Sequence, residues 1–327
     1  RAVSTTVQFP PQNASLLSQG LQVVAVLQWV FSFLGLAQVC MAVLLSLLVG
    51  RAWILAVLYL VWLYRDRDSP RTGGRRSAWV RNWAVWRHFC DYFPISLVKT
   101  AELPPNQNYV MGVHPHGIMC AGAFCNFSTE GKDFSLQFPG LGPSPMALAG
   151  LFSLPVYHDH LMSTGICSVS HQTLHFISSQ PQRGQALIII IGGGQEFLYS
   201  SPGQHCCFLW ERKGFVRLVL WHGASLVPVY SFGENDIFKV KVSATSSWSH
   251  GLCFSGRGLF SADSWGLLPF AVPITSLVGR PIQVLQCLNP TEEEVDHYHR
   301  LYMKAMEQFE EHKESCGVPA STHLTFL

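Results

Sequence analysis

Residues 108–127, NYVMGVHPHGIMCAGAFCNF, decide how the rest of the chain is interpreted. They begin as a short apolar strand over residues 109–113. They continue into a tight turn, because the proline and glycine of His114-Pro115-His116-Gly117 favour turns over helix interiors. The small residues of 118–127 can then open a helix. Two imidazoles at the carboxyl end of a strand are well placed for proton transfer, since the unperturbed pKa of histidine lies near physiological pH.

Composition places the chain among membrane-attached proteins. Its 327 residues leave room for one large α/β domain with an appendage. Charged residues make up only 13 % and hydrophobic ones 48 %, and the mean hydropathy is +0.21. A net charge of +2 gives no reason to expect nucleic acid as a partner. The ten cysteines lack CxxC spacing, so we expect mostly buried free thiols in a reducing compartment.

The N-terminal part predicts a polar tail over residues 1–20 and a membrane-embedded hairpin over 21–64. Residues 21–64 carry no charge except Arg51 and are too many for one span of about 20 residues. Gly50 and Arg51 form the expected break, although an earlier turn stays open. The limb after the break is short for a core of about 30 Å, so a span followed by an interfacial segment is the alternative. A pair of buried core helices is a further alternative.

Residues 65–98 are expected to form a basic, amphipathic linker on the membrane surface. Between residues 65 and 87 there are seven arginines and two aspartates. The positive-inside rule puts this side in the cytoplasm, and arginines beside a span attract anionic head groups. The spacing of Trp79, Trp83 and Trp86 predicts one amphipathic helix lying on the membrane. Packing of these rings against the domain is the alternative.

Residues 99–327 read as the globular α/β domain. Apolar runs predict strands at 109–113, 186–191, 225–230 and 282–285, alternating with helices at 171–179 and 213–221. Thr291 and Glu294 form a capping box for a last helix, and Gly317 follows its expected end. Its core stripe is Val295, Tyr298, Tyr302, Met306 and Phe309.

Polar groups follow three of the predicted strands. The first strand ends in the two histidines, the second in Gly192-Gly193-Gly194-Gln195-Glu196, and the third in residues 233–236, which include Glu234. Sites in open α/β sheets gather at carboxyl strand ends, where a histidine and a neighbouring carboxylate can form a base and its orienter. The glycines would let a ligand approach backbone amides. A plain glycine turn, a structural ion pair of Glu196 and a histidine that only braces the turn remain alternatives.

The motif content favours direct transfer of an acyl group to a hydroxyl. The chain has no G-x-S-x-G elbow, no P-loop and no G-x-G-x-x-G that opens a helix. A histidine base would take the hydroxyl proton, and amides or cations would stabilise the oxyanion. His158-Asp159-His160 and the pair His171/His175 have ligand-like spacings, but packed or solvated histidines are the better account, so no metal is expected.

The HPHG stretch resembles the diacylglycerol acyltransferase 2 / monoacylglycerol acyltransferase family, and the resemblance covers essentially the whole chain. It implies an α/β domain with a mixed sheet and flanking helices, as in glycerolipid acyltransferases, preceded by a membrane hairpin. The ending, residues 311–320, is most similar to the monoacylglycerol branch. The other matching stretches are DYFP (91–94), KTAELPP (99–105), FPG (138–140), RKGF (212–215), HGASLVPVY (222–230) and FGEND (232–236).

The resemblance implies an endoplasmic-reticulum, multi-pass membrane enzyme with its catalytic domain and termini in the cytosol. It would transfer a fatty acyl group from acyl-CoA to 2-monoacylglycerol, and often on to diacylglycerol, with acyl-CoA as co-substrate and no other cofactor. Diacylglycerol or a wax alcohol as main acceptor, and a catalytically silent lipid-binding paralogue, are the alternatives. The resemblance leaves open a homo-oligomer or a hetero-oligomer with other acyltransferases.

Glycerophosphate acyltransferases, which the chain also resembles, pair a histidine with an aspartate five positions later. Here Ala121 and Met119 stand at that offset, so Glu196 is the candidate replacement. Where relatives usually have alanine in the glycine turn this chain has Gly194, and the segment 242–257 looks shorter than theirs. Arg212 and Lys213 are assigned to the phosphates of CoA. Catalysis is assigned to His116, His114 and Glu196, and substrate binding to Pro115, Gly117, Gly192, Gly193, Gly194, Arg212, Lys213 and Glu234.

Overall fold

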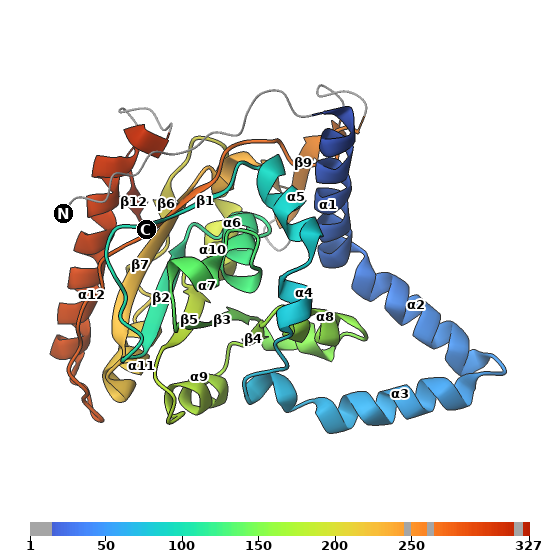
Figure 1. Ribbon diagram of the computed structural model, residues 1–327, viewed down its shortest axis with the longest axis horizontal. Coiled ribbons are helices and arrows are strands. Elements are labelled where there is room, and N and C mark those ends of the chain that lie inside the picture. Colours follow the sequence, from blue (N-terminus) through green and yellow to red (C-terminus); the bar gives the residue numbers. More distant parts are fainter. Residues whose placement is uncertain (1–14, 245–249, 260–264, 317–322) are drawn as a thin grey trace.

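A mixed seven-stranded sheet lies at the centre of the computed structural model (Figure 1), in the order β1-β11-β7-β2-β5-β3-β4. Strands β7, β2, β5, β3 and β4 are parallel, whereas β11 pairs antiparallel with β7 and carries β1 beside it. The structure describes residues 15–244, 250–259, 265–316 and 323–327, and only the backbone of 241–244, 250–253 and 265. The strands are β1 (Ser96–Lys99), β2 (Tyr109–His114), β3 (Gly142–Ala147), β4 (Cys167–Ser168), β5 (Gln185–Ile190), β7 (Ser225–Phe232) and β11 (Thr275–Val278).

Three of the four predicted strands are confirmed as the adjacent strands β2, β5 and β7. The predicted strand at 282–285 is wrong, because Ile282 makes only an isolated bridge to Leu226. Strand β3 was not predicted, since it contains Pro143 and Pro145. Prolines are tolerated there because β4 pairs only with the last two residues of β3, which leaves the proline positions unpaired on that side.

Helices cover both faces of the sheet. Alternate residues of β2 face opposite ways, so Val110 joins a core with α9 (His171–Ser178), α11 (Gly214–His222) and α12 (Glu292–Glu307). Met111 joins a core on the other face, and the elements there are α6 (Ala121–Ala123), the π-helical η2 (Phe124–Ser128) and α7 (Phe134–Gln137).

The last helix confirms its sequence signals. Thr291 and Glu294 form the capping box, and Val295, Tyr302 and Met306 are buried. Helix α12 ends at Glu307, and 3₁₀ turns continue over Gln308–His312 and Glu314–Cys316. Gly317, the expected stop, lies outside the described residues.

A small second sheet and a two-stranded ribbon complete the domain. The small sheet has the order β10-β9-β8 and the ribbon joins β12 to β6. The short segment expected near 242–257 forms the hairpin of β8 and β9, and residues 245–249 between them lie outside the description. The strands are β6 (Cys206–Cys207), β8 (Lys239–Ala244), β9 (His250–Arg257), β10 (Trp265–Gly266) and β12 (Thr325–Phe326).

Three apolar helices precede the domain: α1 (Leu16–Leu34), α2 (Leu36–Val49) and α3 (Trp53–Asp66). The predicted break at Gly50 is confirmed, but a second break at Gly35 divides the expected first limb. The polar tail is shorter than predicted, because Ser15 caps α1 through the backbone N–H of Ser18; residues 1–14 lie outside the description. Of the described helices, α1 alone is long and apolar enough to cross a membrane.

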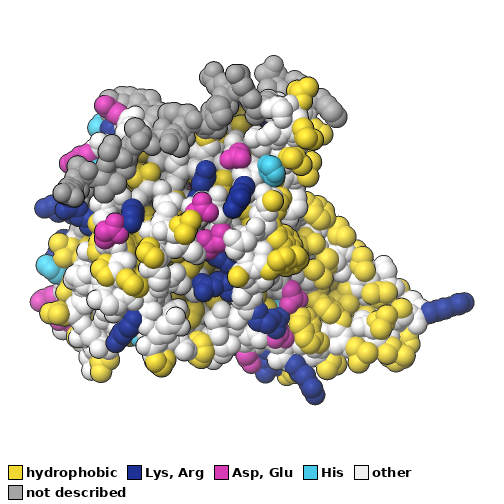
Figure 2. All heavy atoms as spheres, viewed as in Figure 1, with side chains coloured by type: hydrophobic (Ala, Val, Ile, Leu, Met, Phe, Trp, Pro, Cys, Tyr) yellow, Lys and Arg dark blue, Asp and Glu magenta, His cyan; other side chains and the backbone are white. Residues whose placement is uncertain are grey.

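Helix α1 packs on the domain, whereas α2 and α3 form an arm that projects from it (Figure 1). The Trp29 ring meets Phe89 of α5 (Ala84–Tyr92) at 4.9 Å between centroids, and Trp29 is fully buried. On the arm, large apolar side chains are exposed, for example Val49 at 90 % and Leu55 at 63 %. Figure 2 shows them covering the arm.

The predicted amphipathic helix of the linker is wrong, because the linker has two short helices after the turn η1 (Ser69–Arg71). These are α4 (Ala78–Arg81) and α5, which meet at Asn82 and Trp83. Trp79 is 73 % exposed, but Trp86 is 1 % exposed, and its Nε1–H donates to the carbonyl of Val80. The three tryptophans therefore do not share one exposed face.

The cysteine expectation needs correction as well. Cys90 of α5 and Cys125 of η2 are joined by a disulfide. Seven of the described cysteines are free, but only Cys167 and Cys207 of these are buried.

Arg81 ties the linker to the domain although it belongs to the basic run. Its side chain is 4 % exposed and pairs with Glu130 at 3.0 Å. The guanidinium also donates to the carbonyls of Phe127 and Thr164, both at 2.9 Å. A buried guanidinium thus satisfies backbone carbonyl groups of two separate segments, one in η2 and one just after the helix that ends at Ser163.

Replacing Arg81 by methionine should destabilise the protein strongly, because the carbonyls of Phe127 and Thr164 would lose their buried charged donor and Glu130 would lose its cationic partner. We expect Arg81→Met to lower the free energy of unfolding by about 3–5 kcal/mol. The matched control is Arg217→Met, since the pair of Arg217 with Glu292 is exposed and such pairs contribute about 0–1 kcal/mol. Denaturant unfolding in detergent measures both; equal losses would contradict this account of Arg81.

Candidate active site

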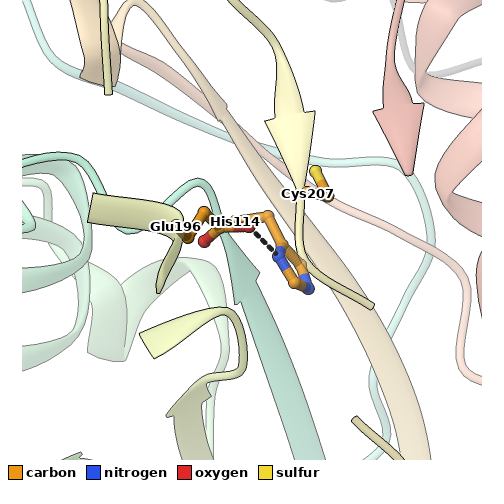
Figure 3. A group of neighbouring side chains, drawn as sticks. All are labelled: His114, Glu196 and Cys207. Carbon is orange, nitrogen blue, oxygen red and sulfur yellow. Dashed lines mark hydrogen bonds and ion pairs between the residues drawn. The ribbon is translucent and has the colours of Figure 1, made fainter. Parts of the chain in front are cut away.

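The carboxyl ends of β2 and β5 bring Glu196 beside His114 (Figure 3). Glu196 lies in α10 (Gly193–Leu198), and its Oε1 is 3.1 Å from His114 Nδ1. Its Oε2 accepts a hydrogen bond from the backbone N–H of His116 at 2.7 Å. Phe208, which sequence reasoning missed, donates its backbone N–H to Oε1 at 3.3 Å. The carboxylate therefore holds the ring of one histidine and the backbone of the other.

His114 is a buried brace. It is fully buried and faces the α12 side of the sheet, where its ring lies 6.2 Å from that of Tyr302. No described residue forms a hydrogen bond with its Nε2. His114 is not among the residues that line the cavity of His116.

His116 faces a cavity of about 400 Å³. Its Nδ1 lies 2.8 Å from the carbonyl oxygen of Gly117. A carbonyl only accepts, so in the neutral ring Nδ1 carries the proton and Nε2 keeps its lone pair. The thiol of Cys120 lies 3.6 Å from Nδ1 and 3.9 Å from Nε2. His116 is thus the imidazole with a nitrogen able to take a proton from a molecule in the cavity.

The rest of the cavity wall is largely apolar. It comes from the end of α1, the segment after the HPHG turn, β3 and β5, η3 (Ala149–Ser153), α8 (Tyr157–Ser163) and α10. Examples of the lining side chains are Phe33, Met119, Leu151 and Phe197. A volume of about 400 Å³ is in the usual range of ligand sites and suits a hydrocarbon chain.

The three glycines that follow β5, residues 192–194, have different roles. A Cβ on Gly192 would collide with the carboxyl group of Glu196, so this glycine allows close packing. Gly193 has φ +57°, a conformation that favours glycine. A Cβ on Gly193 or Gly194 would meet no atom within 4 Å, and both line the cavity. These two are the glycines that leave room for a ligand.

Pro115 and Gly117 shape the turn. The His114–Pro115 bond is cis, and Gly117 has φ +59°. A Cβ on Gly117 would come within 2.7 Å of Glu234 Cγ. Neither residue is part of the cavity wall.

Glu234, assigned above to substrate binding, is instead buried beneath the turn at 1 % exposure. It follows β7 in the turn η4 (Glu234–Asp236), and its carboxyl accepts from the backbone N–H groups of Ala121 and Gly122 at 2.7 and 2.8 Å. Burial raises its pKa to about 7, and the two amide donors oppose this shift. Glu234 anchors the segment that follows His116.

The two cations assigned to CoA differ. Arg212 donates to the neutral amide oxygen of Gln195 at 2.8 Å, next to the glycines that line the cavity. Lys213 pairs with Asp296 of α12 at 2.6 Å. Arg212 is therefore the better placed of the two to meet an anion near α10.

The segment that carries Phe208 depends on residues far along the chain. Strand β6 pairs with β12, and Leu209 and Trp210 donate their N–H groups to the carbonyl of Leu327. The only signal in the sequence was the adjacent pair Cys206-Cys207, which indicated no role.

Two clusters of potential metal ligands occur among the described residues. In the first, donor atoms of His114, Glu196 and Cys207 lie within 4.8 Å of one another, but the Glu196 oxygens already accept three hydrogen bonds. The second joins His158 and Asp159 to Asp66 rather than to His160, and both nitrogens of His158 are engaged, by Phe152 O at 2.8 Å and Asp66 at 2.7 Å. Hydrogen bonds within the protein thus already occupy the main potential metal-ligand atoms of both clusters.

The raised pKa of Glu234 predicts a pH-dependent stability. The pKa of about 7 exceeds the unfolded value of 4.5, so the folded chain holds an extra proton between these pH values. Stability contributed by the protonated carboxyl is present below about pH 4.5 and is lost as the pH rises through about 7. Relative to Glu234→Gln, we expect the wild type to lose on the order of 1–3 kcal/mol between pH 5 and pH 8.

Denaturant unfolding of both chains at the two pH values checks this. Glu102→Gln serves as control, because Glu102 is 75 % exposed. A pH-independent difference between the wild type and Glu234→Gln would contradict the placement of Glu234.

Comparison with known proteins shows that this chain is similar to acyltransferases. The model of the family described as Diacylglycerol acyltransferase matches residues 45–327. Human 2-acylglycerol O-acyltransferase 3 is 60 % identical, covering 99 % of both chains, and human diacylglycerol O-acyltransferase 2 is 49 % identical, covering 94 % of this chain and 83 % of the relative. Among solved structures, the 1-acyl-sn-glycerophosphate acyltransferase of Thermotoga maritima is similar with 11 % identity and a TM-score of 0.41, covering 90 % of this chain and 95 % of that one.

The first of these relatives bears on two expectations. Its name agrees with the monoacylglycerol branch indicated by residues 311–320. The alignment spans 339 positions, more than the 327 residues of this chain, so the chain lacks some residues that the relative has.

Proposed function

The chain belongs to the diacylglycerol acyltransferase family, and from this membership we propose that it transfers a fatty acyl group from acyl-CoA to 2-monoacylglycerol, giving diacylglycerol. One observation carries the proposal: His116, whose Nδ1 lies against the carbonyl of Gly117, lines an apolar cavity of about 400 Å³. The 60 % identity to human 2-acylglycerol O-acyltransferase 3 supports the choice of acceptor.

In the proposed reaction His116 is the general base. Its Nε2 takes the proton of the acceptor hydroxyl, and the oxygen attacks the carbonyl carbon of the acyl thioester. The C–S bond then breaks, and the CoA thiolate receives the proton from the imidazolium. Since Gly117 holds Nδ1, the ring keeps one orientation through both proton transfers.

Glu196 acts as a positioning residue in this scheme. It does not contact the ring of His116, but it fixes the backbone of His116 and the ring of His114. The scheme therefore differs from the predicted pair of a base and the carboxylate that orients it. Glu196 orients the ring of His114, whereas the carbonyl of Gly117 orients the ring of His116, the proposed base.

We assign the acyl chain to the apolar cavity and the phosphates of CoA to the surface near Arg212. Arg212 lies beside α10, whose first residues, Gly193 and Gly194, line the cavity. A guanidinium suits phosphate because it offers several donors in one plane. Acyl-CoA is the co-substrate, and the scheme needs no further cofactor.

The arm of α2 and α3 supports a membrane-embedded location, which we assign to the endoplasmic reticulum. Each of its helices has 14 residues, or about 21 Å, short of a core of about 30 Å. We therefore infer that the arm enters the bilayer and returns to the same side, with the arginines of 65–87 at the cytosolic surface. Phe33 of α1 lines the cavity, which favours entry of lipids from the membrane side.

Diacylglycerol is the second candidate acceptor, because human diacylglycerol O-acyltransferase 2 is 49 % identical to this chain. Wax alcohols and a silent lipid-binding role stay as outcomes of the test below.

The test uses microsomes that contain wild type, His116→Ala or His175→Ala at equal protein level. His175 is a control because it lies on α9, away from the cavity, and its Nδ1 contacts Ser179. Labelled acyl-CoA is offered with 2-monoacylglycerol, diacylglycerol or a fatty alcohol. We expect diacylglycerol formation to fall about 10²–10⁴-fold in His116→Ala and to persist in His175→Ala. A folded, membrane-bound wild type that acylates no acceptor would instead support the silent paralogue.

Gly192→Ala should impair the reaction without touching the cavity. The new Cβ would push against Glu196, which holds the backbone of His116, and small displacements of catalytic groups cost up to about 10²-fold in rate. Gly20→Ala in α1 is the matched control, since its Cβ meets no atom within 4 Å and Gly20 does not line the cavity. Turnover of 2-monoacylglycerol at saturating acyl-CoA measures both; equal rates would argue that Glu196 does not position His116.

A further inference from the structure

A second cavity, of about 470 Å³, lies between the base of the arm and the domain. One wall comes from the last turns of α3 and from η1, and the other from η3 and Ser168 of β4. Leu60, Leu63 and Phe152 make part of its lining apolar. It is separate from the cavity that His116 lines, because none of the residues lining one lines the other.

Two arginines of the cavity lining lie beside a single carboxylate. Arg67 and Arg71 reach Asp68 at 3.6 and 3.0 Å, and the side chains of the two arginines are 54 % and 44 % exposed. The neighbouring Asp66 is occupied by Arg75 at 2.6 Å and by His158 at 2.7 Å. Two cations against one carboxylate leave a positive charge at this end of the cavity, which favours an anion there.

Ser168 supplies an independent observation. The residue is 2 % exposed, it lines the cavity, and its hydroxyl oxygen has no hydrogen-bond partner among the described residues. A buried hydroxyl without a partner is costly in a folded protein, so Ser168 would favour a ligand that offers an acceptor atom at this wall.

We propose that this cavity binds an amphiphilic lipid whose head group carries a phosphate or carboxylate. The anion meets Arg67 and Arg71, the hydrocarbon lies along Leu60 and Leu63, and an ester oxygen of the lipid accepts from Ser168. The position of the cavity at the base of an apolar arm gives such a lipid access from the bilayer surface. This site is distinct from the acyl-transfer site and does not depend on that reaction.

The two cavities share a wall, so occupancy of one should affect the other. Within η3, Ala149, Phe152 and Ser153 line the lipid cavity, whereas Leu151 lines the cavity of His116. A lipid that fills the cavity below the arm would hold η3 in place and so stabilise the wall of the cavity that His116 lines. This consequence for activity rests on the proposed function, but the binding itself does not.

Binding is measured directly on the full chain in neutral detergent by native mass spectrometry. The probes are dioleoyl phosphatidic acid, dioleoyl phosphatidylcholine and inorganic phosphate. We expect the anionic lipid to bind at least about tenfold more tightly than the zwitterionic one. Competition by inorganic phosphate at the affinity of the lipid would overturn the assignment to a lipid and identify a phosphate site.

Two variants test the residues. Arg67→Gln/Arg71→Gln should weaken phosphatidic acid binding at least about tenfold, while Arg51→Gln, which lies between α2 and α3, leaves binding unchanged. Ser168→Ala should weaken binding without lowering the unfolding temperature of the lipid-free chain, because its hydroxyl has no partner to lose. Equal binding by wild type and the arginine double variant, or a Ser168→Ala chain that is destabilised but binds normally, would refute the site.

Discussion

The buried carboxylate of Glu196 is the constraint on which the site depends. It is 1 % exposed and accepts from the ring of His114, the backbone of His116 and the backbone of Phe208. A buried carboxylate is tolerated only when its oxygens are satisfied, so three segments must meet: the end of β2, the segment of Phe208 and α10, which carries Glu196 itself. The parallel strands β2 and β5 bring two of them together, and the absence of a side chain at Gly192 gives the carboxyl group its space.

The same constraint separates the roles of the two histidines. Within a strand, residues two apart share a face, yet the turn after His114 sends His116 to the opposite side, into the cavity. Glu196 holds this turn from the β5 side and Glu234 anchors the following segment from the β7 side. One imidazole is thereby available for chemistry while the other stabilises the turn.

The sequence predicts the features that depend on residues close to one another along the chain. Apolar runs indicate β2, β5 and β7, and the capping box of α12 is read from two residues. Features that depend on tertiary contacts escape it. Strand β3 is not predicted, because it contains two prolines. Glu234 is predicted to face a ligand, although it is buried and accepts hydrogen bonds from two backbone amides of another segment. The burial of Arg81 inside a basic run likewise follows from carbonyls more than 40 residues away, as the separation from Phe127 shows.

The pairing of β6 with β12 has a consequence for biosynthesis. The segment that offers Phe208 to Glu196 is supported by Thr325–Phe326 and by the carbonyl of Leu327, whereas the arm of α2 and α3 lies within the first 66 residues. During translation the arm leaves the ribosome first, so in the membrane location proposed above it would enter the bilayer while the later strands are still being made. The carboxylate acquires its full support only after residues 325–327 have been made, so this part of the site is completed long after the arm.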